Sequence, residues 1–166
     1  MASNRHLGRI IVLQTLYEES FRSACGDKSV DQQEILERNI SRYRATLDDH
    51  DFIIALARDV SANADQLDAK LQPIAPEWPL DQIARVDHLI LQMGAYELEN
   101  HKDVPPKVVI NEAVELAKGF GGENSSKFIN GVLGTFLRQI NPKLAKELDT
   151  EHKKSEESST KENEET

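Results

Sequence analysis

Apolar residues recur at intervals of three and four positions along most of the chain up to Ile140, which is the spacing of amphipathic helices. The clearest run lies near the C-terminal end of this pattern and consists of Phe128, Ile129, Val132, Leu133, Phe136, Leu137 and Ile140. The run before it consists of Val109, Ile110, Ala113, Val114 and Ala117. Each set forms one face of a helix, so these two segments predict a pair of helices with buried faces.

Proline and glycine mark the limits of this helix pair. Pro105 and Pro106 suit the start of the first helix, and the glycine-rich segment 119–122 is typical of its end. Asn124 and Ser125 are good N-caps for the second helix. Gly131 and Gly134 lower helix propensity within the second helix. We therefore expect another group to approach its backbone closely there.

Four further helical segments precede this pair. The first falls within residues 1–22, and the others are expected at Gln32–Arg44, from Asp48 to Leu71, and at Leu80–Glu99. Residues 73–79, which contain three prolines, are the best candidate for a hinge between two helical halves. We expect Trp78, within this hinge, to pack against the helix that follows.

These segments predict an all-α protein made of two small helical bundles packed together. The N-terminal bundle spans residues 1–72 and begins with a basic arm, and the C-terminal bundle spans residues 73–142. Residues 143–166 form a charged tail. From about Glu151 this tail contains no apolar residue, so we expect it to be largely disordered.

Charge and cysteine content limit the possible functions. The net charge of −9 argues against a protein that coats nucleic acid unselectively, so any surface for nucleic acid must be local. The single cysteine, Cys25, excludes an internal disulfide and a cysteine-based zinc cluster. The sequence contains neither an apolar signal core nor an apolar run long enough to span a membrane, so a cytoplasmic location without membrane contact is expected.

No spacing of residues predicts catalysis. The sequence has no GxxxxGK[ST], HExxH or GxSxG motif. His50 lies between two aspartates, but adjacent helical residues point in different directions, which favours a solvated helix start over a metal site. Glu97 is expected to be partly buried with a structural partner, and Glu112 and Glu115 to form a salt-bridged or solvated face. The prediction is a protein that is not an enzyme and has no cofactor or metal.

Two regions remain as candidates for recognition. Arg5, His6 and Arg9 lie at the start of the first helix, where positive charge opposes the helix dipole, and they form either a solvated basic end or an arm that contacts phosphates. The start of the last core helix combines exposed N–H groups with Lys127, which favours an anion. The aromatic ring of Phe128 is either a core residue or a platform on which an unpaired base stacks.

The segment 103–133 carries a resemblance to a known family. Its sequence, DVPPKVVINEAVELAKGFGGENSSKFINGVL, resembles the signature region of the NusB family, which consists of bacterial transcription antitermination factors. The segment RVDHLILQMGAYEL resembles the helix that precedes this region in the family, and LQTLYE resembles part of the first helix. The likeness covers most of the chain up to about Ile140.

The resemblance implies a NusB-like fold and a function in RNA binding. It implies that the protein binds boxA-like single-stranded RNA together with NusE, a small-subunit ribosomal protein, and promotes readthrough of ribosomal RNA operons by the transcription elongation complex. The implied RNA-binding residues are Arg5, His6, Arg9, Asn124, Ser126, Lys127 and Phe128. The implied residues for the protein partner are Tyr17 and Asp87. Two alternatives are a protein-binding helical adaptor without RNA contact and a stand-alone relative of the RNA-binding module of ribosomal RNA cytosine methyltransferases.

Overall fold

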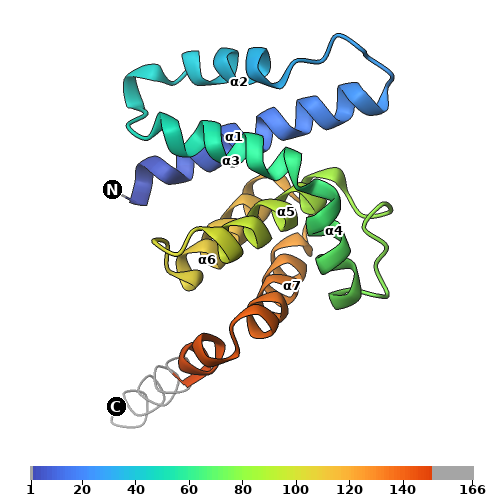
Figure 1. Ribbon diagram of the computed structural model, residues 1–166, viewed down its shortest axis with the longest axis vertical. Coiled ribbons are helices and arrows are strands. Elements are labelled where there is room, and N and C mark those ends of the chain that lie inside the picture. Colours follow the sequence, from blue (N-terminus) through green and yellow to red (C-terminus); the bar gives the residue numbers. More distant parts are fainter. Residues whose placement is uncertain (1, 151–166) are drawn as a thin grey trace.

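The computed structural model describes residues 2–150, and no strand occurs within them (Figure 1). The α-helices are α1 (Ala2–Ala24), α2 (Gln32–Ser41), α3 (His50–Ala62), α4 (Ala64–Leu71), α5 (Arg85–Asn100), α6 (Pro106–Phe120) and α7 (Ser125–Ile140). Two short 3-10 helices, Arg44–Thr46 and Gln72–Ile74, lie in the connections. The predicted all-α class with two packed bundles is confirmed.

The N-terminal bundle consists of α1, α2 and α3, which lie together in the upper half of Figure 1. Asp31 caps α2 by accepting hydrogen bonds from two backbone N–H groups, and Asp49 caps α3 by accepting one from Phe52. Helices α1 and α3 cross closely at Gly8, where an added Cβ would lie 3.0 Å from Cγ1 of Ile53. A glycine at this position therefore sets the spacing of the two helices.

The C-terminal bundle is built around α5, α6 and α7, which pack against one another and share one apolar core with the N-terminal bundle. Helices α5 and α7 approach each other closely at Gly94, where an added Cβ would lie 2.6 Å from a methyl carbon of the fully buried Leu133. The sequence places the expected close approach at Gly131 and Gly134 instead. That expectation is wrong for the described residues, because nothing beyond the local helix lies within 4 Å of the Cβ position of Gly131, and only the end of the Arg138 side chain, at 4.0 Å, lies near that of Gly134.

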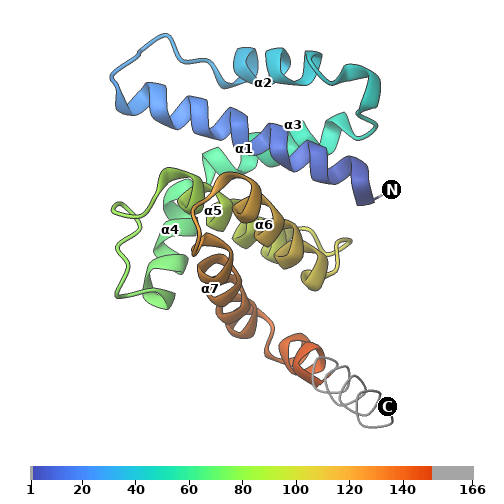
Figure 2. The same ribbon diagram turned by 180° about the vertical axis from the view of Figure 1, so that it is seen from behind.

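Helix α4 belongs structurally with the C-terminal bundle. The helix expected to continue to Leu71 breaks at Asn63, whose side-chain amide donates a 2.7 Å hydrogen bond to the carbonyl of Asp59 and so competes with helical bonding. Beyond the break, α4 packs mainly against α5 (Figure 2). The chain therefore passes from the N-terminal bundle to the C-terminal bundle at Asn63, and not at the proline-rich residues 73–79.

The segment before α5 also differs from the expected helix. Residues 80–84 form turns, and α5 begins at Arg85. The backbone N–H of Leu80 donates a hydrogen bond to the side chain of Gln72, which holds this segment against the preceding 3-10 helix. The expectation that Trp78 packs on the following helix is wrong. Its side chain is 58% exposed and meets Phe128 of α7 edge to face, at 6.3 Å between ring centroids.

The ordered chain continues past Ile140. Residues 142–150 are helical, Ala145 is buried and Leu148 packs partly against the core. Residues 143–150 of the tail are therefore helical, and the part expected to be disordered from about Glu151 lies outside the described residues, so the expected disorder stays a prediction. None of the helices within residues 2–150 is both long enough and apolar enough to cross a membrane.

Candidate nucleic-acid interface

Arg5 is held by carboxylates from two connections of the chain. Its guanidinium lies 3.0 Å from Asp49, before α3, and 3.4 Å from Asp103, before α6. It also lies over the ring of Phe52, at 4.6 Å from the centroid. About a third of the Arg5 side chain remains exposed. Arg5 therefore joins α1 to both bundles while keeping one edge open to solvent.

His6 faces the C-terminal bundle. Its Nδ1 lies 2.6 Å from a carboxylate oxygen of Glu112 on α6, and the side chain is 38% exposed. Glu115, one turn further along α6, pairs with Lys118. The expectation that Glu112 and Glu115 are salt-bridged is confirmed, although the partner of Glu112 comes from a distant part of the chain.

Arg9 is buried and forms a bidentate ion pair with Glu97 of α5. The two donor–acceptor distances are 2.9 Å and 2.7 Å, and both side chains are almost completely inaccessible. Burial alone would raise the pKa of Glu97, but the hydrogen bonds and charges of His101 and Arg9 outweigh it, so the pKa lies below its ordinary value. The predicted partner for Glu97 is confirmed. The prediction that Arg9 belongs to an exposed basic arm is wrong.

The start of α7 is tied to α5 by a buried serine. The Oγ of Ser125 accepts a 2.8 Å hydrogen bond from the N–H of Gly122 and donates a 3.0 Å bond to Oδ2 of Asp87. The side chain of Asn124, expected to cap α7, makes no capping hydrogen bond. Asn124 and Lys127 are exposed, and Ser126 is half-buried. The polar groups of this first turn, apart from Ser125, thus remain available to a ligand.

Phe128 lines a pocket of about 480 Å³ together with Trp78 and the first turn of α5. Its ring is half-buried and touches the core on one side, so it is neither a full core residue nor a free one. Asp87 lines the same pocket, and its Oδ1 is buried without a hydrogen-bond partner among the described residues. Three of the predicted site residues, Asn124, Phe128 and Asp87, therefore meet at one place.

Tyr17 lies on a separate aromatic surface of α1. Its ring is 39% exposed and stacks on Phe21 with 6.2 Å between centroids, and the guanidinium of Arg85 lies over Phe21. A groove of about 280 Å³ between Tyr17, Val86 and Phe120 adjoins these rings. Val86 lines this groove and Asp87 lines the Phe128 pocket, so both hollows border the first turn of α5. Tyr17 is consequently a surface residue and not a core tyrosine.

Sequence reasoning missed the residues that complete both surfaces. Trp78 was expected to pack against the helix that follows it, and Phe21 and Phe120 were not singled out for recognition, although all three are exposed aromatics. Phe120 lies within the glycine-rich segment GFGG and is the last residue of α6, where its side chain is exposed. The position of Phe120 in a glycine-rich segment was the one sequence feature that could have indicated its exposure. By contrast, no group of three potential metal ligands occurs among residues 2–150.

Comparison with known proteins shows the family to which this chain belongs. The NusB family model matches residues 6–138. The chain belongs to the NusB family. The NusB transcription antitermination protein of Dehalococcoides mccartyi (strain CBDB1) is 38% identical over 140 residues, which cover 84% of this chain and 94% of that protein. The NusB protein of Chloroflexus aggregans is 39% identical and covers 82% of this chain and 89% of its own length. Both relatives are transcription antitermination proteins, which are not enzymes.

Solved structures agree with the assignment. A crystal form of T. maritima NusB superposes with a TM-score of 0.74 at 31% identity, covering 86% of this chain and 96% of that structure. The NusB fold is also shared by a structure of antitermination factors NusB and NusE in complex with dsRNA, at a TM-score of 0.72 and 21% identity, covering 84% and 99% of the two chains. The latter likeness supports the fold alone.

Proposed function

We propose that this antitermination factor binds a boxA-like single-stranded RNA together with a NusE-type ribosomal protein, and that the assembly promotes readthrough of ribosomal RNA operons by the elongation complex in the cytoplasm. The observation that carries the proposal is that two hollows lined by exposed aromatic residues border consecutive residues of α5, Val86 and Asp87. Two ligands that occupy neighbouring surfaces can stabilise each other. A protein of the same fold has been solved with NusE and dsRNA, so a fold of this kind can hold both classes of ligand.

RNA is assigned to the first turn of α7. Lys127 and the free N–H groups of this turn favour phosphate, because the helix dipole is positive there. Phe128 offers a half-exposed ring for a base, and Asn124 and Ser126 offer polar groups at the same turn. Arg5 and His6 contribute through their exposed edges only, since their remaining donors are engaged by carboxylates.

The protein partner is assigned to the surface around Tyr17, with Asp87 at its boundary. Exposed aromatic rings that lie side by side are typical of the centres of protein interfaces. The acidic chain, with a net charge of −9, also suits a basic ribosomal protein. Binding there would place the partner next to the RNA, so that one nucleic acid could contact both proteins.

The test is RNA titration with and without the ribosomal partner. We expect weak binding alone and tighter binding with the partner. Tyr17→Ala should remove the gain that the partner brings and leave the weak binding unchanged. Ile54→Ala is the matched control, because Ile54 is an exposed apolar residue of similar exposure on α3. Equal RNA affinity with and without the partner would contradict the proposal.

A protein-binding adaptor without RNA contact is the second candidate. The observation that favours it is the engagement of Arg5, His6 and Arg9 with carboxylates, which leaves few free cations at that end of α1. An adaptor of this kind would bind the partner with the same affinity in the presence and absence of RNA. Measuring partner affinity in the same titrations therefore separates the two functions.

A further inference from the structure

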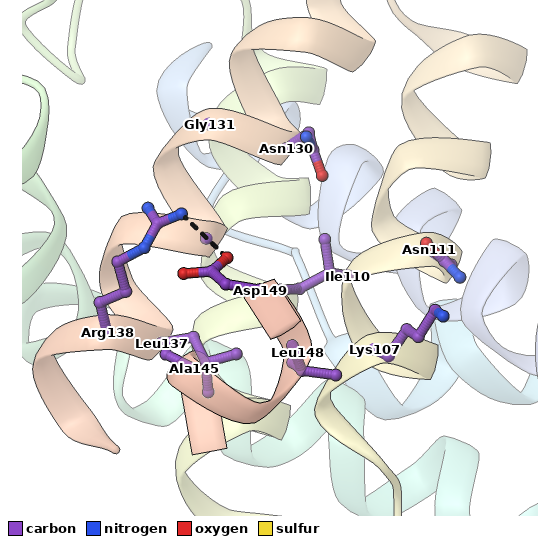
Figure 3. A pocket seen from close by; sticks show the side chains of 11 residues that line it. Lys107, Ile110, Asn111, Asn130, Gly131, Leu137, Arg138, Ala145, Leu148 and Asp149 are labelled. Carbon is purple, nitrogen blue, oxygen red and sulfur yellow. Dashed lines mark ion pairs between the residues drawn. The ribbon is translucent and has the colours of Figure 1, made fainter. Parts of the chain in front are cut away.

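A second hollow lies further along α7, between α6, α7 and the helix formed by residues 142–150 (Figure 3). Its volume is about 230 Å³, and it shares no lining residue with the Phe128 pocket. Its polar lining consists of Lys107, Asn111, Asn130, Arg138 and Asp149. Three of these side chains belong to the signature segment 103–133, but the proposed function gives them no role.

The groove has cationic side chains on opposite walls, which is unusual in a chain of net charge −9. Arg138 extends from α7 and Lys107 from α6, as Figure 3 shows. The ion pair of Arg138 with Asp149 is loose, at 3.7 Å, and both side chains are more than half exposed. Lys107 is exposed and has no ion pair within residues 2–150. One of the two cations therefore lacks a counter-charge.

Between these walls the groove is open and of mixed polarity. Ile110 and Leu137 contribute apolar lining, and the backbone of Gly131 is uncovered, since nothing lies within 4 Å of its Cβ position. No aromatic side chain lines the groove, so it offers no platform for stacking a base. A helix that brings small and aliphatic residues could lie close to the backbone here.

The chain itself supplies an example of such a ligand. The helix 142–150 packs Ala145 and Leu148 at the groove and directs Asp149 to Arg138. These three positions, at i, i+3 and i+4, lie on one face of a helix. Asn141 separates this helix from α7 and accepts a hydrogen bond from the N–H of Leu144, so the segment has its own cap and a one-residue link. It can therefore leave the groove as a unit.

We propose that the α6 and α7 side of this groove is a docking site for an acidic amphipathic helix of another protein, and that residues 142–150, which form the third wall of the groove, cover this site as an internal substitute. The unpaired Lys107 is the reason to expect an external ligand, because a partner helix with a second carboxylate would engage both walls. The internal helix has the advantage of a short link, which gives it a high effective concentration. A partner helix must therefore make more favourable contacts with the groove than the internal helix, which offers only the carboxylate of Asp149.

The test uses a fluorescent peptide with the sequence of residues 142–150, PKLAKELDT, and the full chain. We expect weak binding to the unmodified chain and several-fold tighter binding to Asp149→Asn and to Leu148→Ala, because both changes weaken the internal competitor. The Asp149→Asn variant keeps the apolar contacts and remains informative if Leu148→Ala loosens the helix. Circular dichroism and a melting curve confirm that each variant is folded.

A charge swap makes the test specific. Arg138→Glu should abolish binding of this peptide, and a peptide carrying Asp149→Lys should bind the Arg138→Glu variant and not the unmodified chain. Lys118→Glu is the matched control, since it reverses an exposed charge on α6 at a position outside the groove lining. Equal peptide binding by Arg138→Glu and the unmodified chain would overturn the proposal.

Two other outcomes would also overturn it. A gain in RNA affinity on Asp149→Asn, with no gain in peptide binding, would assign the groove to nucleic acid. Self-association of the Leu148→Ala variant in sedimentation, without peptide binding, would assign it to a second copy of this chain. Neither outcome bears on the titrations with the ribosomal partner, so the proposed function is tested separately.

Discussion

The start of α1 and the start of α7 both carry basic residues, but the surroundings of these residues differ. At α1, Arg5, His6 and Arg9 each meet a carboxylate from a distant part of the chain. At α7, Lys127 is exposed and has no ion pair among residues 2–150. The three α1 side chains join the two bundles, whereas Lys127 of α7 remains available to a ligand.

This difference shows that the sequence of a basic cluster does not indicate whether its residues form internal ion pairs or bind a ligand. The partners of Arg5, His6 and Arg9 lie between 44 and 106 positions away in the chain, so no local pattern points to them. Their packing also removes the unfavourable effect of positive charge at a helix start, because the carboxylates supply the compensating charge. The four predictions below test whether the residues at the start of α1 have a structural role and those at the start of α7 bind a ligand.

The largest effect is expected from Arg9→Ala. The change leaves Glu97 as a buried carboxylate without its main partner, which costs about 3–5 kcal/mol of unfolding free energy. Urea denaturation measures this loss. The control is the double substitution Arg9→Met/Glu97→Leu, which removes both charges and should recover most of the stability. A loss below about 1 kcal/mol in the single variant would contradict the structural role.

The same pair predicts a dependence on pH. Because the folded-state pKa of Glu97 is lowered, the unfolded chain takes up the proton at about pH 4.3 while the folded chain still excludes it. The contribution of Glu97 is therefore fully present above that pH and is lost as the pH falls through the lower folded pKa. Glu97→Gln should cost about 3 kcal/mol near neutral pH and flatten the acid side of the stability curve. Urea melts between pH 7 and pH 3 measure both effects.

A smaller effect, on RNA binding, is expected from Phe128→Ala. Loss of one base–aromatic stack should weaken RNA affinity by about 1–3 kcal/mol. The half-buried ring should cost less stability than the about 3–5 kcal/mol of a fully buried phenylalanine, and partner binding should persist. Phe136→Ala, at a fully buried position on the same helix, provides the contrast. Normal RNA binding by the folded fraction of Phe128→Ala would remove the stacking role.

The smallest effect concerns salt. Lys127→Ala should reduce the slope of log affinity against log salt concentration by about 0.7, the value for one phosphate contact with a single strand. Arg9→Ala should not change this slope as long as the protein is folded. Lys70→Ala serves as the control, because Lys70 pairs with Glu99 on a different face. An unchanged slope in Lys127→Ala would place the phosphates elsewhere.

The helices were predictable because their buried faces repeat with the helical period. The run from Phe128 to Ile140 in α7 and the helix from Gln32 in α2 were predicted nearly at their observed bounds. The break at Asn63 was missed, since the apolar period continues across it from Val60 to Leu67 and outweighs one polar residue. The helix 142–150 was missed because only Ala145 and Leu148 anchor it, too few for a clear period.

The candidate site was predictable where its residues are close together in the sequence, as at Asn124 to Phe128. It was not predictable where helices from both bundles meet. The neighbouring positions of the Tyr17 groove and the Phe128 pocket depend on where α5 begins, and that start was expected at Leu80 instead of Arg85. The wrong expectation for Trp78 has the same cause, because the helix on which it was expected to pack was placed too early in the chain. Tertiary packing decides both, and one-dimensional patterns do not contain it.

The close approach of α5 and α7 at Gly94 has a genetic consequence. A methyl group at position 94 would overlap the side chain of Leu133, and the surrounding core leaves Leu133 little room to move. Positions 94 and 133 are therefore constrained as a pair. A suppressor screen that begins with Gly94→Ala should recover smaller residues at position 133, 39 positions along the chain, before it recovers changes in the residues next to Gly94.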